Sequence, residues 1–245
     1  MLLFFGMVML AACSTTSRLG EEDILYTGVK HTRITTDDKN LKVPPEIKDN
    51  IHTAVKVAAN NSLYAPYIRS PFPIGLWVYN HWSPQSKGIK GWFYRKLVEE
   101  PVLISDVRPD LRMKMVEDML AQNGYFGSTT SYELLYDKRN PKKARVNYSV
   151  RITRPKHFCQ IRLLADTTDT TEITRTINRL ANADTYLQQG SVYCTDSLLD
   201  VRNRIANNLR NRGYYYFRPE YISYLADTTM VADSVVVQMT YTDDT

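Results

Sequence analysis

The chain has 245 residues, 43% of them hydrophobic and 23% charged, which is typical of a globular protein and excludes a disordered one. This length allows one large domain or two ordinary domains, each with its own buried core. The net charge is +5, but lysine and arginine are scattered and form no single stripe. This pattern disfavours nucleic-acid binding, because contact with a phosphate backbone requires clustered cations.

An apolar run at the N-terminus ends directly at a cysteine. Residues 1–12 are too few to span a bilayer as a helix, which takes about 20 residues, but they have the length of the apolar region of a signal peptide. Leu10-Ala11-Ala12-Cys13 resembles a bacterial lipobox, in which the cut precedes a diacylated cysteine. Lysine and arginine are absent before the run, which departs from that pattern. We expect residues 1–12 to be a lipoprotein signal peptide, Cys13 to carry acyl chains such as palmitate, and residues 13–23 to form a polar tether. An ordinary signal peptide is the alternative.

Residues 24–155 are predicted to form a first α+β module. A strand at 24–34 precedes a helix at 45–59, whose apolar residues recur at helical spacing. That apolar face consists of Ile47, Ile51, Val55 and Ala58. The remaining predicted elements are a helix from Pro109 to Gly124 and strands at about 128–137 and 145–153.

The first module carries an insertion between its helices, at about 61–105. The insertion is rich in proline and aromatic residues and holds all three tryptophans. We favour a long loop that folds back over the module with its own small core. The alternative is a contact surface for a partner, because Trp and Tyr are good interface anchors. The aromatic residues considered for such a surface are Trp77, Tyr79, Trp82 and Trp92.

Residues 156–245 are predicted to repeat this order of elements. The first predicted elements are a strand at 157–164 and a helix at 171–182 with Ile173, Ile177 and Leu180 inward. A second helix runs from a capping-box-like start at Ser197 to Gly213. A strand from Tyr214 to Leu225 follows, and then a last strand with Val235, Val237, Met239 and Tyr241 on one face. An offset of 89 residues relates the copies (213 − 124) and places Tyr132 on Tyr221. The predicted fold class is α+β, with two tandem β-α-α-β-β modules, each a three-stranded sheet covered by two helices.

Cysteine and catalytic motifs give weaker signals. Export places the chain in an oxidising compartment, so Cys159 and Cys194 could form a disulfide, and each could equally be a small buried hydrophobic residue. Nucleophile, zinc-binding and phosphate-loop motifs are absent from the sequence, and its four histidines lack ligand spacing. We therefore expect no enzyme, no cofactor and no metal.

The order strand-helix-helix-strand-strand, with Gly124-Tyr125-Phe126 closing the second helix, resembles the POTRA domain. The lipobox, Leu25-Tyr26-Thr27-Gly28-Val29-Lys30 and Gly75-Leu76-Trp77-Val78-Tyr79-Asn80 together resemble the TamA-type lipoproteins of the Bacteroidota, within the BamA/TamA superfamily. This resemblance covers the whole mature chain. It implies a lipid-anchored arm at the outer membrane, facing the periplasm, that receives unfolded outer-membrane or secreted polypeptides or docks an assembly partner. In the family the arm leads to a β-barrel, and the sequence ends at Thr245 before any run of barrel strands.

The expected sheets suggest how polypeptides would bind. An open sheet edge can add a strand from an extended chain through main-chain hydrogen bonds. Pro219 falls inside the predicted strand Tyr214–Leu225, which must then be an edge or bulged there, because proline cannot donate to a ladder. The expected binding edges are Tyr132, Leu134 and Tyr136 in the first module and Tyr221, Ser223 and Leu225 in the second. For these edges, the alternative is that they are solvated or blocked. For the function, the alternative is a structural envelope lipoprotein that binds peptidoglycan or another envelope protein without client transfer.

Overall fold

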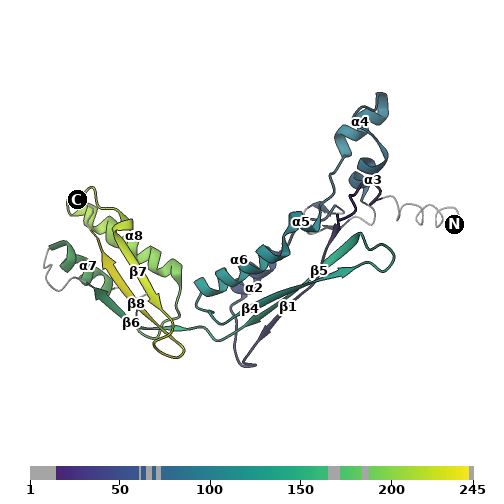
Figure 1. Ribbon diagram of the computed structural model, residues 1–245. Helices are drawn as coiled ribbons and strands as arrows, with labels where there is room; N and C mark the ends of the chain where they lie inside the picture. Colours follow the sequence, from purple (N-terminus) through teal and green to yellow (C-terminus); the bar gives the residue numbers. More distant parts are fainter. Residues whose placement is uncertain are drawn as a thin grey trace. The chain divides into compact units, whose positions relative to one another are not determined.

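A computed structural model describes residues 15–60, 62–64, 68–69, 73–164, 172–183 and 188–242 (Figure 1). The signal peptide and Cys13 lie outside the described residues. The chain forms two three-stranded sheets, in the orders β1-β5-β4 and β6-β8-β7, each accompanied by helices in the order β-α-α-β-β. The predicted fold class, two tandem α+β modules, is confirmed.

The first module contains the predicted elements with small shifts in their bounds. They are β1 (Leu25–Thr36), α2 (Pro45–Val55), α6 (Pro109–Gln122), β4 (Thr129–Tyr136) and β5 (Lys143–Ile152). Helix α2 buries the predicted Ile47, Ile51 and Val55, but it ends before Ala58. Strand β5 alternates strictly, and its buried side chains, each at most 1% exposed, form the sheet side of the core: Ala144, Val146, Tyr148, Val150 and Ile152.

The insertion is largely structured. Its elements are β2 (Ser62–Tyr64), β3 (Ile68–Arg69), α3 (Ile74–His81), α4 (Gly88–Leu97) and the short α5 (Ile104–Val107). Leu76 and Val78 of α3 are each 1% exposed, and the segment expected to be a long loop contains the helices α3 and α4. The side chains of α4 are mostly exposed.

The second module consists of β6 (His157–Leu164), α7 (Glu172–Asn182), α8 (Thr195–Asn211), a 3-10 turn η2 (Pro219–Tyr221), β7 (Ile222–Asp227) and β8 (Ser234–Tyr241). One core joins α8 to the predicted face of β8. In α7, Ile177 is buried but the predicted Ile173 and Leu180 are only partly so; Thr174, Thr176 and Ala181 are buried instead.

Two predicted boundaries in the second module are wrong. Helix α8 begins at Thr195, two residues before Ser197, and has no side-chain cap. The strand expected from Tyr214 begins only at Ile222, and Pro219 starts η2, where its fixed φ suits a helical turn. The cause is Phe217, which is 5% exposed and whose carbonyl accepts a hydrogen bond from Arg210 Nε (2.8 Å). Burying this side chain draws the segment into the core and delays the strand.

The repeat holds at 89 residues for the final strands but not for the strands before them. Tyr132 lies opposite Tyr148 in the first module, and Ala226 lies opposite Val237 in the second. Since Tyr148 and Val237 correspond, Tyr132 corresponds to Ala226, an offset of 94 (226 − 132). The second module therefore has five extra residues before its strand, and Tyr221, matched to Tyr132 from sequence, lies in η2.

The described chain also divides into two compact units whose limits differ from those of the modules. Unit 1 holds the described residues within Met1–Thr35, Lys42–Val116 and Thr129–Arg151. Unit 2 holds Thr36–Leu41, Glu117–Ser128 and Ile152–Thr245. The turn that ends α6, at Gly124, thus belongs to unit 2.

Candidate functional site

The first strand of each module is partly covered along its outer edge. In the first module Leu25 forms an antiparallel bridge with Leu103, and in the second His157 forms one with Val192. Leu103 and Val192 are 89 residues apart (192 − 103), so the repeat extends to this contact. Sequence reasoning missed this contact. These bridges close the beginning of β1 and β6 to further pairing.

Strands β4 and β7 end their sheets and have no second strand partner within the described ranges. In β4 one hydrogen bond fixes which main-chain groups face the open edge. Asp137 N–H donates to the Lys143 carbonyl (2.9 Å), and these residues are opposite each other in the register that pairs Tyr136 with Ala144. Hydrogen-bonded and non-hydrogen-bonded pairs alternate along antiparallel strands. The N–H and C=O groups directed to the open edge therefore include those of Tyr132, Leu134 and Tyr136.

In β7 the same reasoning shifts the predicted set by one residue. Thr242 N–H donates to the Tyr221 carbonyl (3.0 Å), in the register that pairs Ile222 with Tyr241. The groups directed to the open edge are consequently those of Ile222, Tyr224 and Ala226. The predicted Ser223 and Leu225 direct their main-chain groups toward β8, and Tyr221 precedes the strand. Leu225 nevertheless presents a side chain that is 65% exposed, on the face opposite the core.

The β4 edge has exposed aromatic side chains. Tyr132 is 43% exposed and Tyr136 53%. A groove of about 590 Å³ crosses the face of this sheet that is opposite its core, and it is lined mainly by polar residues of all three strands, among them Arg33, Glu133 and Asn147.

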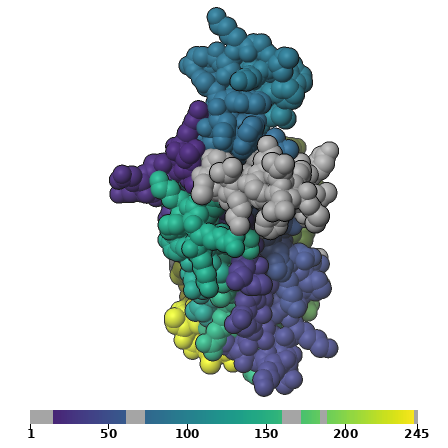
Figure 2. All heavy atoms as spheres, turned by 90° about the vertical axis from the view of Figure 1, so that its right-hand side faces the viewer, coloured from purple at the N-terminus to yellow at the C-terminus, as the bar shows by residue number. Residues whose placement is uncertain are grey.

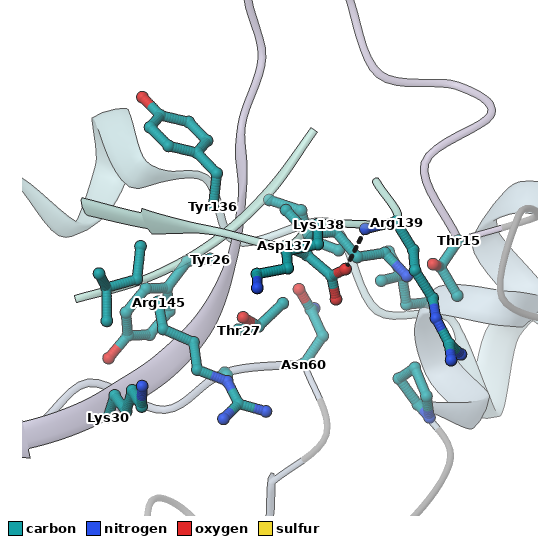
Figure 3. A pocket seen from close by; sticks show the side chains of 16 residues that line it. Thr15, Tyr26, Thr27, Lys30, Asn60, Tyr136, Asp137, Lys138, Arg139 and Arg145 are labelled. Atoms are coloured by element: carbon teal, nitrogen blue, oxygen red, sulfur yellow. Dashed lines mark hydrogen bonds between the residues drawn. The ribbon is translucent and has the colours of Figure 1, made fainter. Parts of the chain in front are cut away.

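A second pocket, of about 650 Å³, lies where the β4–β5 hairpin meets the start of β1 (Figure 3). Its charged lining residues are Lys30, Lys138, Arg139, Lys143, Arg145 and Asp137, five cations against one carboxylate. Asp137 accepts a hydrogen bond from the Arg139 main-chain N–H (2.7 Å). Thr15 also lines the pocket; it is 4% exposed, and its hydroxyl has no partner among the described residues. The pocket is therefore suited to an anionic group such as a carboxylate or phosphate.

Asn60, 6% exposed, joins the two ends of the insertion beside this pocket. Its side chain donates to the Glu100 carbonyl (2.6 Å) and accepts from the Val102 N–H (2.8 Å). Burial raises the pKa of the Glu99 carboxyl, and a hydrogen bond with Asn60 opposes that rise. The insertion is thereby fixed on the module at its base.

Residues 15–20, part of the predicted tether, are held against unit 1 and are not free. Asn80 of α3 accepts hydrogen bonds from the Ser17 hydroxyl (3.0 Å) and the Arg18 N–H (3.2 Å). It also donates to the Thr15 carbonyl (3.2 Å). The Arg18 guanidinium donates to the carbonyls of Tyr79 and Trp82 and lies 5.8 Å from the Tyr79 ring centre.

The β4–β5 hairpin holds the other side of this segment. Lys142 donates to the carbonyls of Leu19 (3.2 Å) and Gly20 (2.8 Å), and Asn140 donates to the Thr16 hydroxyl (3.0 Å). Figure 2 shows this purple segment between the blue helices of the insertion and the green-teal hairpin. Residues 15–20 are thus part of the folded unit.

The four aromatic residues considered for a partner surface have different environments. Trp77 stacks on His81 (4.6 Å between ring centres) and contacts Trp82 edge-on (5.5 Å), and Trp82 lies near Phe93 (6.3 Å). Tyr79 is half-buried beneath Arg18. Only Trp92 of these four is largely exposed, at 53%.

Cys159 and Cys194 are free thiols, each half-buried, and the considered disulfide is not formed. Among the described residues, no group of three or more His, Cys, Asp or Glu is placed to hold a metal ion. Within the same residues, no helix is long and apolar enough to cross a bilayer.

Structural comparison finds POTRA domains as neighbours. POTRA1-2 of the periplasmic domain of Omp85 from Anabaena has a TM-score of 0.40 and 9% identity, over 92% of this chain and 100% of that chain. POTRA3-5 of BamA from Haemophilus influenzae has a TM-score of 0.40 and 10% identity, over 91% and 68%. The N-terminal domain of Omp85 from Thermosynechococcus elongatus has a TM-score of 0.34 and 10% identity, over 90% and 63%. No protein-family model and no curated protein matches the sequence. The element order and sheet topology of each module, not these scores, carry the fold assignment.

Proposed function

We propose that this chain is the periplasmic, polypeptide-binding arm of an outer-membrane protein assembly or translocation factor. It binds extended clients by strand addition to β4 and β7 and catalyses no reaction. The observation that carries the proposal is the pair of sheet edges, one in each module, whose main-chain groups point outward in a regular series. The resemblance to TamA-type lipoproteins of the Bacteroidota supports the same role.

Binding through the main chain suits a receiver of many clients. Each outward residue offers one donor and one acceptor, so recognition does not depend on client side chains. A main-chain hydrogen bond contributes about 0.5–1.5 kcal/mol net, and ordering a client residue costs about 1–2 kcal/mol. These terms nearly cancel, so we expect weak and reversible binding, to which Tyr132 and Tyr136 add apolar contact.

Proline substitutions at the open edge test the proposal. Leu134→Pro and Ala226→Pro each remove an outward N–H without removing a hydrogen bond to the neighbouring strand. Leu134→Ala and Ala226→Ser retain the N–H and serve as matched controls. Binding of a ten-residue peptide with alternating apolar residues is measured by calorimetry and by amide chemical shifts.

The proline variants should lose most of the peptide binding, whereas the controls should keep it. Peptide shifts should centre on β4 and β7. Equal peptide affinity in the proline variants and their controls, with the circular dichroism spectra unchanged, would contradict strand addition.

The proposal includes anchoring at the outer membrane through a lipid on Cys13. Replacement of Cys13 by Ser should prevent acylation of the full-length chain. Mass spectrometry should then show a product without the mass of the acyl chains. A Cys13→Ser variant that retains the acyl mass would reject lipidation at this residue.

One observation favours a second candidate function, a structural lipoprotein that binds peptidoglycan. The pocket with five cationic side chains suits the carboxylates of peptidoglycan stem peptides. Co-sedimentation with purified sacculi tests it, comparing the native chain with Arg145→Gln and with Lys48→Gln, a control on α2. Loss of sacculus binding only in Arg145→Gln would favour this candidate.

A further inference from the structure

Helix α4 of the insertion exposes a contiguous apolar face. Ile89 is 76% exposed, Trp92 53%, Leu97 42% and Phe93 38%. These positions follow helical spacing and share one side of α4. Large exposed apolar residues that are contiguous mark a binding surface more often than isolated ones do.

The opposite side of α4 is packed, which fixes the direction of the apolar face. Gly91 is buried, and a Cβ there would lie 2.0 Å from the Ser86 carbonyl oxygen, so no larger residue fits. Tyr94 on the same side is half-buried. At the end of the helix, Glu99 N–H donates to the Gly75 carbonyl (3.3 Å). The helix therefore cannot rotate its apolar residues inward without losing this packing.

The charged residues of α4 and the one directly before it are all cationic, and Glu99 and Glu100 follow the helix. Residues 50–98 contain no Asp or Glu, while α4 and the residue before it carry four exposed cations: Lys87, Lys90, Arg95 and Lys96. Lys96 lies on the same side of α4 as Ile89, Trp92 and Phe93, and its long side chain can carry the charge past them to the headgroups. Trp and Phe on one side of a helix that also carries Lys and Arg match the boundary between lipid headgroups and acyl chains. Acidic headgroups would complement the cations.

The N-terminal segment brings the expected anchor to the same part of unit 1. Arg18 bonds to the carbonyls of Tyr79 and Trp82, at the end of α3, and α3 leads directly into α4. Thr15 is buried only two residues after Cys13. A lipid at Cys13 would therefore hold this region of the insertion near a membrane surface.

We propose that α4 lies in the interfacial layer of an anionic lipid bilayer, with Ile89, Trp92, Phe93 and Leu97 inserted and the surrounding cations on lipid phosphates. This contact goes beyond the proposed polypeptide binding and does not depend on it. It also does not require the acyl chain, because the helix supplies both the apolar and the charged contacts.

The test uses the full chain with Cys13→Ser, so that no acyl chain contributes. Binding is measured by co-sedimentation with two kinds of vesicle. One contains phosphatidylcholine alone, and the other contains phosphatidylcholine with about 30% of the anionic lipid phosphatidylglycerol. We expect binding to the anionic vesicles only, weakened by salt. Acyl chains brominated near the headgroup should quench tryptophan fluorescence, and Trp92→Phe should remove most of that quenching.

Variants of the two kinds of contact are measured separately. Lys90→Gln with Lys96→Gln should weaken vesicle binding about 25-fold, at roughly fivefold for each lysine. Ile89→Ser with Trp92→Ser should weaken it about tenfold or more. The controls are Lys48→Gln on α2 and Met115→Ser on α6, where Met115 is 58% exposed; neither should change binding.

Three results would overturn the proposal. They are absence of binding to anionic vesicles, equal loss in the α4 variants and their controls, and a dimer in sedimentation velocity without vesicles that requires Trp92. The last would identify a second copy of the chain as the occupant of this face. Peptide binding to β4 and β7, measured on the same α4 variants, should be unchanged, so failure here and failure of strand addition are distinguishable.

Discussion

Replacement of Gly124 by Ala tests whether the turn that ends α6 is fixed by close contact within unit 2. Gly124 has φ +88°, a conformation that costs an L-residue about 1–2 kcal/mol. A Cβ at this position would lie 2.8 Å from the Tyr193 carbonyl oxygen and 3.2 Å from that of Lys156. Overpacking against such backbone atoms costs about 1–3 kcal/mol. The two effects together predict a loss of about 2–5 kcal/mol.

Gly213 provides a matched control. It ends α8 with φ +105°, but a Cβ there would meet nothing within 4 Å. Gly213→Ala should therefore cost only the conformational part, about 1–2 kcal/mol. Urea unfolding followed by circular dichroism gives the free energies of both variants. Hydrogen exchange adds a local probe, the Tyr193 N–H, which donates to the Lys156 carbonyl (3.0 Å).

The Gly124→Ala variant should lose more stability than Gly213→Ala and should exchange the Tyr193 amide faster. Equal losses in the two variants would mean that the contacts with Tyr193 and Lys156 do not constrain this turn. A smaller loss in Gly124→Ala than in Gly213→Ala would refute the reasoning altogether.

Four further predictions concern individual side chains. Asn80→Ala should free residues 15–18 and destabilise unit 1 by about 1–3 kcal/mol, because it leaves main-chain groups without their partner. Trypsin should then cut after Arg18 faster than in the native chain. Unchanged cleavage would count against the attachment of this segment to Asn80. Tyr148→Phe should cost no stability, because the buried Tyr148 hydroxyl has no partner among the described residues, whereas Tyr26→Phe should cost about 1 kcal/mol, because that hydroxyl donates to the Val57 carbonyl (3.4 Å). Burial raises the pKa of Tyr148, so the folded state keeps a proton that the unfolded state loses above about pH 10. The free energy of unfolding should therefore fall as pH rises past that value, and it should fall less steeply in Tyr148→Phe. Identical pH profiles of the two proteins would contradict this. In the Cys13→Ser variant, Cys159 and Cys194 should each take one iodoacetamide without prior reduction, seen as two additions by mass spectrometry. An alkylation-resistant protein 2 Da lighter than the thiol form would instead show the disulfide.

Local patterns in the sequence predicted most of the elements and the inward faces of several. Helical spacing identified Ile47, Ile51 and Val55, and period-two alternation identified the core face of β8. Both signals depend on the geometry of one element, so they survive without knowledge of its neighbours. Gly124 and Gly213 marked the helix ends for the same reason, since each turn requires a positive φ.

Longer-range packing decided which groups form the candidate sites. The burial of Phe217 moved the start of β7, and with it the main-chain groups that face the open edge changed from Ser223 and Leu225 to Ile222, Tyr224 and Ala226. A shift of one residue in a strand exchanges its two sides, so a small error in a boundary reverses the assignment.

The sequence by itself determined the fold class, because the periodicity of each element and the repeat at 89 residues can be recognised in the sequence alone. Only the tertiary structure decided which charged residues lie together and where the N-terminal segment binds. Lysine and arginine look scattered in the sequence, yet Lys30 of β1 and Arg139 of the β4–β5 hairpin line one pocket. Residues 15–20, which look like a polar tether, bind a helix more than 60 residues away. Contacts between residues so distant in sequence have no local signature, because folding alone brings them together.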